Sequence, residues 1–299
     1  MKKINYLFQL MFLFIQLCAV GKVIGQDKVI LTINKQEQFI LDSKITATSY
    51  HLSISLPMHY SLKDTIHYPV LYLLDGNYSF PIAHAARQVQ DMFDGLENVI
   101  IVGIGYTWEQ SLVPWHTGRW RDYLPTSDTS IKGDNNPWVL NSLNLKNGDL
   151  HSGGADAFIK AMKNEIMPLI EKKYKTNGDN GITGHSNGGL FASYCLVKEP
   201  KLFKRYGINS PALWWDKKII FQLEKSFYEQ NRCIAAKVFM SVGSLEGEMV
   251  KLMTDFADSL KTHHYKGLTL NQQIFENENH MSVIPASISR TLRVLYPKK

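Results

Sequence analysis

A serine at the centre of a glycine-rich turn has the setting that most clearly indicates chemistry. The pattern G-x-S-x-G occurs within residues 182–189 (ITGHSNGG), with Ser186 at its centre. A strand-like segment precedes it and an expected helix, residues 190–197, follows it; in that context the motif forms a sharp turn that projects a nucleophilic hydroxyl. The N–H of Asn187 then lies at a helix start, where it favours an oxyanion. The alternative is an incidental serine in a turn, and the flanking elements and third glycine favour catalysis.

A serine nucleophile needs a base and an acid elsewhere in the chain. In hydrolases with this motif the acid follows the serine along the chain, and the histidine comes last. His280 lies in a polar loop after the expected last strand, residues 268–275, and is the predicted base. Glu246 follows the preceding strand, residues 237–242, and is the predicted acid, with Glu248 as second choice. The alternatives are a surface-loop histidine and two solvated carboxylates in the first turn of a helix.

The other histidines fit the role of base less well. His263 and His264 end a helix before the last strand. His185 adjoins the nucleophile, where we expect it to pack or to line the site. His116 and His151 belong to a long irregular segment, so only a contact with substrate is open to them.

The apolar patterns predict an α/β fold. Residues 29–57 alternate polar and apolar side chains, as exposed antiparallel strands do. Continuous apolar runs of strand length suit strands that are buried on both faces of a parallel sheet; they occur at residues 69–74, 99–104, 206–209 and 238–242. Helical stripes lie between them, at residues 156–173, 245–260 and 281–295. Alternating strands and helices predict a mostly parallel sheet with helices on both faces.

A stretch rich in Trp, Gly, Pro, Asn and Asp interrupts this alternation. It runs from Tyr106 to Ser152 and has no clear periodicity. A loop of that length inside a compact domain is usually functional, so we expect a lid or a wall of the binding site.

The N-terminus has the composition of a secretory signal. Lys2 and Lys3 precede an apolar run from Tyr6 to Val20 and small residues near Gly25. We therefore predict a signal peptide at residues 1–25 and a single α/β domain at residues 26–299, in the periplasm or outside the cell. A retained membrane anchor is the alternative, but the run is short and contains two glutamines, so we expect no stable membrane insertion after cleavage.

Composition narrows the classes of partner. The chain has 299 residues and a formal net charge of +6, which falls to +3 when the signal and its three lysines leave. A charge so small indicates no nucleic-acid footprint. The mature chain keeps two cysteines, Cys195 and Cys233, too few for a disulfide framework. We expect both to be small buried residues, with a single bridge between them as the alternative.

The order of motifs resembles the putative-esterase branch of the α/β-hydrolases, which includes the enterobactin and salmochelin esterases. The resemblance spans nearly the whole mature chain. It is carried by a strand ending in Asp-Gly, a strand and arginine-bearing loop, a helix, the serine turn and a Ser-Pro-x-x-Trp-Trp segment. These are found at residues 68–76, 103–126, 153–174, 184–186 and 210–215.

The resemblance implies further roles around the serine. Backbone N–H groups near Gly76 and Asn77 would complete an oxyanion hole with Asn187. Arginine and tryptophan beside the site hold catechol groups in siderophore esterases, and the matching residues here are Arg119, Trp214 and Trp215. A guanidinium can pair with phenolate oxygens and an indole can stack on a catechol ring. Core packing is the alternative for the two tryptophans.

These features predict a secreted serine esterase that uses a Ser-His-acid acyl-enzyme mechanism and needs no metal or organic cofactor. Its substrate is a small-molecule or glycan ester, with a catecholate siderophore trilactone as one hypothesis. A carbohydrate esterase acting on acetyl xylan or feruloyl esters is the alternative. An acyltransferase and a non-catalytic binding protein are the remaining hypotheses; the latter is disfavoured because the serine, the histidine and the glycines of the turn are all present.

Overall fold

The computed structural model describes residues 36–63, 65–92, 95–107 and 111–298. These residues belong to one compact unit, which runs from Asn34 to Lys299. The predicted signal at residues 1–25 lies outside the described residues, as do residues 29–35 of the first expected strand. Within the described residues no helix is long and apolar enough to cross a membrane.

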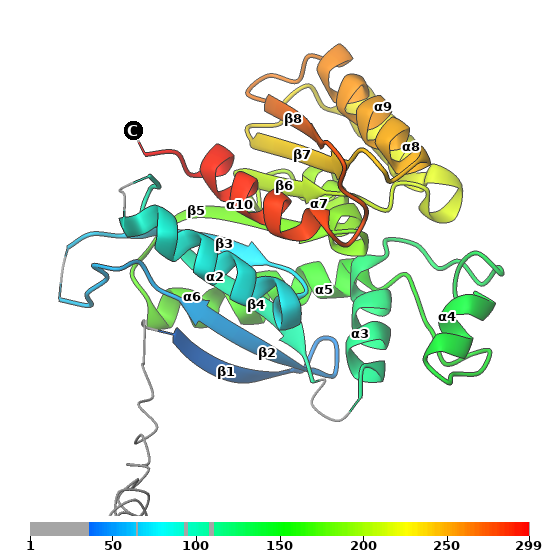
Figure 1. The fold of residues 1–299 in the computed structure, drawn as a ribbon, viewed down its shortest axis with the longest axis horizontal. Coiled ribbons are helices and arrows are strands. Elements are labelled where there is room, and N and C mark those ends of the chain that lie inside the picture. Colours follow the sequence, from blue (N-terminus) through cyan, green and yellow to red (C-terminus); the bar gives the residue numbers. More distant parts are fainter. Residues whose placement is uncertain (1–35, 64, 93–94, 108–110, 299) are drawn as a thin grey trace, which may run out of the picture. The chain divides into compact units, whose positions relative to one another are not determined.

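An eight-stranded mixed sheet forms the centre of the fold (Figure 1). Its strand order is β1-β2-β4-β3-β5-β6-β7-β8; β1 and β2 pair antiparallel, β2 pairs antiparallel with β4, and the remaining pairs are parallel. This confirms the mostly parallel sheet with antiparallel N-terminal strands. The strands are β1 (Gln36–Ser43), β2 (Thr48–Ser55), β3 (Tyr68–Leu73), β4 (Ile100–Tyr106), β5 (Thr176–His185), β6 (Arg205–Asn209), β7 (Lys237–Gly243) and β8 (Thr269–Phe275).

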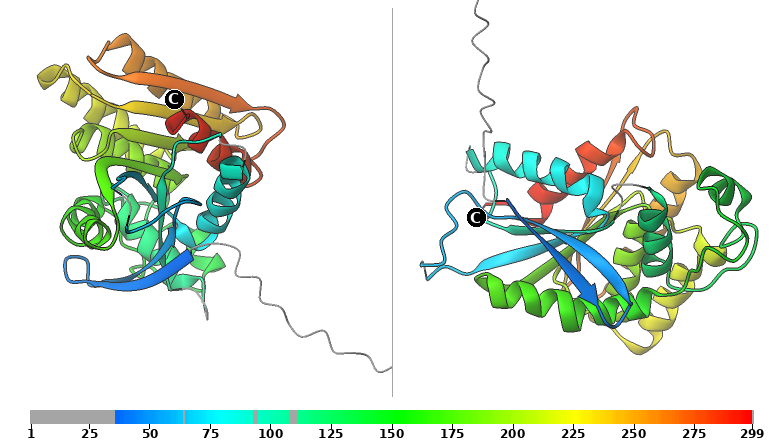
Figure 2. Two further views of the ribbon diagram at one scale, coloured as in Figure 1. Left: turned by 90° about the vertical axis from the view of Figure 1, so that its left-hand side faces the viewer. Right: turned by 90° about the horizontal axis from the view of Figure 1, so that it is seen from below.

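Helices cover both faces of the sheet (Figure 2). Two of them, α2 (Gly76–Met92) and α10 (Val283–Leu295), share one apolar cluster with β3, β4 and β7. The larger cluster, on the other face, takes in side chains of the other helices. Among these are α5 (Ala155–Ala161), the π-helical turn η1 (Met162–Ile166), α6 (Met167–Lys173), α7 (Asn187–Lys198), α8 (Trp215–Gln230) and α9 (Glu248–Thr262).

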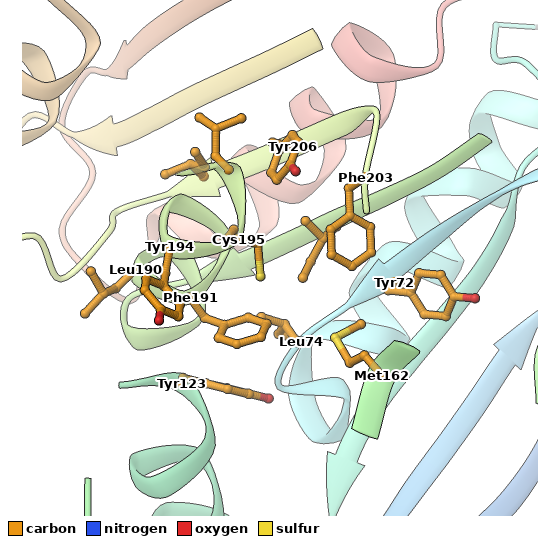
Figure 3. Packing of buried hydrophobic residues seen from close by; sticks show 14 of the residues in the cluster. Tyr72, Leu74, Tyr123, Met162, Leu190, Phe191, Tyr194, Cys195, Phe203 and Tyr206 are labelled. Atoms are coloured by element: carbon orange, nitrogen blue, oxygen red, sulfur yellow. The ribbon is translucent and has the colours of Figure 1, made fainter. Parts of the chain in front are cut away.

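The core beneath the serine turn is dense in aromatic side chains. Figure 3 shows Phe191 of α7 close to Tyr123, and their ring centroids are 5.9 Å apart. Phe158 packs 5.1 Å from Phe191 on another side. All three rings are fully buried. Aromatic contacts at these separations stabilise packing beyond the burial of area alone, so α7 rests on a rigid base.

Residues 106–152 contain more regular structure than the sequence analysis expected. Two helices lie there, α3 (Val113–Tyr123) and α4 (Pro137–Ser142), and each has a proline at its start. The expectation of one irregular loop is therefore wrong. Burial of Tyr123 and Trp120 against the core supports α3, a tertiary effect that periodicity does not reveal.

The cysteines do not form a bridge. Cys195 is buried in α7, and Cys233 is exposed; both are free thiols. The bridged alternative is thus not formed, and the expectation of burial is wrong for Cys233.

Candidate active site

Ser186 stands at the junction of β5 and α7 in a strained backbone conformation. Its φ is 60° and its ψ is −117°, outside the ordinary regions for an L-residue. Its N–H donates to the Asn209 carbonyl at 3.0 Å, and its own carbonyl accepts the N–H groups of Leu190 and Ala212, each at 3.0 Å. These bonds hold a geometry that costs about 1–3 kcal/mol when left to itself. Ser186 is half-buried, so it is partly accessible to solvent.

The glycines around Ser186 differ in how strictly they are required. A Cβ added to Gly184 would lie 2.5 Å from the backbone of Gly188, and one added to Gly189 would lie 2.7 Å from the Asn209 carbonyl oxygen. A Cβ on Gly188 would meet the Leu74 side chain at 3.4 Å and Asp75 Oδ2 at 3.6 Å, which are ordinary contact distances. Close packing therefore demands glycine at the first and third positions, whereas the second has room.

His280 and Glu246 form a tight hydrogen-bonded pair. The His280 Nδ1 lies 2.6 Å from Glu246 Oε2; the glutamate side chain is fully buried and the histidine is 36% exposed. Burial raises the pKa of the Glu246 carboxyl, but hydrogen bonds from His280, Ser210 and the Gly243 N–H outweigh it, so the net pKa is lowered. The carboxylate is thus an anion placed to orient an imidazole and to stabilise its cation.

His185 brings this pair next to the serine turn. The centroids of the His185 and His280 rings are 4.5 Å apart, and Ser186 is the residue after His185. His185 is buried, and neither of its ring nitrogens makes a hydrogen bond in the structure. Burial holds the pKa of His185 well below its ordinary value, and the nearby His280 and Arg119 lower it further. The His185 ring therefore packs against His280 as a neutral group.

Glu248, the second choice for the acid, lies apart from His280. Its side chain is 69% exposed and forms an ion pair with Lys218 at 3.4 Å. His263 also has a carboxylate partner, Glu224, at 2.6 Å, at the C-terminal end of α9. The described residues therefore include two Glu-His pairs. Of these two, the pair of His280 lies beside the serine turn, because the His280 ring contacts His185.

The start of α2, which closely follows β3, lies against the next strand of the chain, β4. A Cβ on Gly76 would approach the Gly103 and Ile104 backbone to 2.8 Å, so only glycine fits at this position. The Asn77 amide bonds the backbone of Tyr106 in both directions, Nδ2 to its carbonyl at 2.6 Å and Oδ1 from its N–H at 2.9 Å. Asn187 is buried at the first position of α7. The first residues of α2 and of α7 are therefore both held rigidly.

Arg119 has a partner that the sequence analysis did not foresee. Its Nε and Nη2 donate to the two oxygens of Asp75 at 2.7 and 2.9 Å, and Asp75 is fully buried with a φ of 54°. Trp115 Nε1 donates to the same carboxylate at 3.1 Å. Instead of an open guanidinium facing a ligand, the structure shows a buried bidentate pair that fixes the residue immediately before Gly76.

The two tryptophans after β6 differ. Trp215 is 1% exposed, its Nε1 donates to the Thr126 side chain at 3.2 Å, and its ring packs edge-on to Trp120 at 5.5 Å. Core packing is therefore its role, and the expected substrate contact is corrected. Trp214 is 39% exposed and lies two residues beyond Ala212, which bonds the Ser186 carbonyl. It remains available to a ligand.

One well-formed cleft of the described residues does not contain Ser186, His280 or Glu246. It measures roughly 640 Å³ and is lined by residues of β1, β2 and α2, Gly76 and Asn77 among them. Its other lining residues include Gln38, His51 and His84. Chemistry and not cleft size therefore identifies the site.

We predict that Gly189→Ala lowers stability and activity far more than Gly188→Ala. The Gly189 Cβ has backbone on two sides and must displace the segment that bonds Ser186, whereas Gly188 has ordinary contact distances. Overpacking of this kind costs about 1–3 kcal/mol. Urea unfolding and ester hydrolysis of both variants measure it. Equal losses in the two variants would contradict the proposed packing at the turn.

Comparison with known proteins agrees with the fold. A family model described as putative esterase matches residues 43–132 and 128–280. Ferri-bacillibactin esterase BesA of Bacillus subtilis is 29% identical over 282 residues, which are 89% of this chain and 91% of that protein. The crystal structure of BES protein from Bacillus cereus has a TM-score of 0.75 at 30% identity, covering 90% of this chain and 97% of that one. An IroE-like serine hydrolase from Shewanella oneidensis gives a TM-score of 0.72 at 28% identity, covering 87% and 79%. The chain therefore belongs to the putative esterase family and is a serine ester hydrolase.

Proposed function

We propose that Ser186 is the nucleophile, His280 the general base and Glu246 the orienting acid of this esterase. The observation that carries the proposal is the 2.6 Å bond between His280 and the buried Glu246, beside a serine in strained turn geometry. A buried carboxylate that is bonded to Nδ1 leaves Nε2 as the nitrogen that can accept a proton. The same imidazole then serves as base and as acid in turn.

The proposed reaction proceeds in two steps. Ser186 Oγ attacks the ester carbonyl while His280 takes its proton, and the oxyanion is stabilised by the N–H of Asn187 and by the loop at Gly76 and Asn77. The carbon–oxygen bond to the alcohol then breaks, and the alcohol leaves with the proton from His280. Water, deprotonated by His280, cleaves the acyl-enzyme, which releases the acid and restores the serine hydroxyl.

Replacement of the nucleophile tests this mechanism. Ser186→Ala should lower kcat for p-nitrophenyl acetate by about 10³-fold or more and should abolish labelling by a fluorophosphonate, because no other residue supplies the attacking oxygen. His280→Gln should do likewise. His263→Gln is the matched control: it breaks the other Glu-His pair, and we expect loss of stability with kcat unchanged. Wild-type turnover by Ser186→Ala would rule the mechanism out.

We further propose that the substrate is a bulky ester that carries aromatic groups, of the catecholate siderophore class. The B. subtilis relative is named for ferri-bacillibactin. The exposed Trp214 beside the serine turn offers a flat surface for a ring, and the buried Arg119–Asp75 pair places Trp115 at the neighbouring strand end. Stacking on an indole adds about 0.5–1.5 kcal/mol beyond area burial.

The substrate proposal predicts a selective loss on truncation of Trp214. Trp214→Ala should raise KM for a catecholate trilactone about 3- to 10-fold. It should leave kcat/KM for ethyl acetate unchanged, because that ester has no ring to stack. Trp214→Phe should restore most of the binding. Parallel assays with acetyl and feruloyl xylan complete the test, and faster turnover of these than of the trilactone would contradict the proposal.

Export of the chain is also part of the proposal, on the basis of Lys2, Lys3 and the apolar run that follows. Cleavage near Gly25 should yield a mature N-terminus in the secreted or periplasmic fraction. N-terminal sequencing of the protein purified from the native host measures it. Recovery of the intact N-terminus from the cytoplasm would contradict export.

A further inference from the structure

Ser210 occupies a position directly after β6 that ordinary serines avoid. It is fully buried, and its φ is 40°, in the left-handed region. Its N–H donates to the Ser241 carbonyl at 2.6 Å, which ties it to the neighbouring strand β7. A residue that serves only as a left-handed turn would be glycine at no steric cost. The presence of a buried serine in this conformation therefore indicates that its side chain has a role.

The hydroxyl of Ser210 bonds the acid of the proposed triad. Its Oγ donates to Glu246 Oε1 at 2.6 Å, and the Gly243 N–H donates to the same oxygen at 2.6 Å. Glu246 Oε2 is left for His280 Nδ1, also at 2.6 Å. Two donors on one oxygen fix the rotation of the carboxylate, and the other oxygen then points at the imidazole.

The same short segment also holds the nucleophile. The carbonyl of Asn209 accepts the Ser186 N–H, and the N–H of Ala212 donates to the Ser186 carbonyl, both at 3.0 Å. Ser210 lies between these two residues in the chain. One rigid segment therefore sets the position of the nucleophile by its backbone and of the acid by a side chain.

We propose that Ser210 is a positioning residue for the esterase reaction, whose hydroxyl presents Glu246 to His280. The proposal rests on the proposed roles of Glu246 and His280. Ser210 does not touch the substrate or the reacting atoms, and it acts only through the carboxylate. A hydrogen bond to a charged group in a buried setting contributes more than a neutral one, so its loss should be visible in turnover.

Two variants separate the hydroxyl from the turn. Ser210→Gly and Ser210→Ala both remove the Oγ, but glycine also relieves the backbone strain at φ 40°. We expect kcat for p-nitrophenyl acetate to fall about 10- to 100-fold in both, with KM within twofold of wild type. Thermal unfolding should show Ser210→Gly to be at least as stable as Ser210→Ala. Full kcat in Ser210→Gly would overturn the proposal, because then only the turn matters.

A double-mutant cycle tests whether Ser210 acts through Glu246. In a Glu246→Gln background the further change Ser210→Gly should lower kcat by less than twofold, since the carboxylate that it positions is already gone. The control is Ser287→Ala, which removes a buried hydroxyl that bonds the Ile284 carbonyl in α10, and we expect it to keep wild-type kcat. Independent, multiplying losses in the double variant would overturn the proposal.

The outcomes also distinguish this inference from the triad assignment. If Glu246→Gln retains wild-type kcat, the proposed function of Glu246 fails, and the inference fails with it. If Glu246→Gln is impaired while Ser210→Gly is fully active, only the inference fails. Intact mass and circular dichroism of each variant show in parallel that Ser186 is unchanged and that the fold is kept.

Discussion

The site depends on backbone conformations that an L-residue adopts at a cost. Five successive strands of the sheet, β3 and β5 to β8, are each followed within four residues by a positive φ, which turns the chain sharply at the same edge. The residues are Asp75, Ser186, Ser210, Gly247 and Asn277. Only Gly247 adopts such a value freely. Polar side chains rather than glycine stand at the other four strand ends, so strain is accepted where a functional group must project from a fixed point.

Paired buried charges stabilise that edge. Asp75 has a bidentate arginine and an indole N–H, and Glu246 has a histidine, a hydroxyl and a backbone N–H. A buried carboxylate without such partners is costly. The donors therefore stabilise each carboxylate and also fix its position, Asp75 immediately before Gly76 and Glu246 beside the His280 ring.

Local patterns were sufficient to predict the sheet. Glycine spacing singled out Ser186, and chain order singled out His280 and Glu246; the structure pairs the last two, and His185, the residue before Ser186, packs against His280. Their catalytic roles stay a prediction. What local patterns could not supply was the burial of individual side chains. Arg119 binds Asp75, and Trp215 bonds Thr126, because of neighbours that are 44 and 89 residues away in sequence. The sequence pattern included the Asp-Gly at the end of β3 and the serine after β6. It did not reveal that Asp75 binds Arg119 or that Ser210 bonds Glu246.

The insertion that contains α3 and α4 is joined to two strand ends. Arg119 of α3 ties it to the end of β3 through Asp75, and Thr126 ties it to the segment after β6 through Trp215. Trp120 packs on Trp215 and donates to Asp134 further along the insertion. These anchors are buried and use polar groups that would be left unpaired if the segment swung away. The buried anchors thus fix the base of the insertion at the ends of β3 and β6.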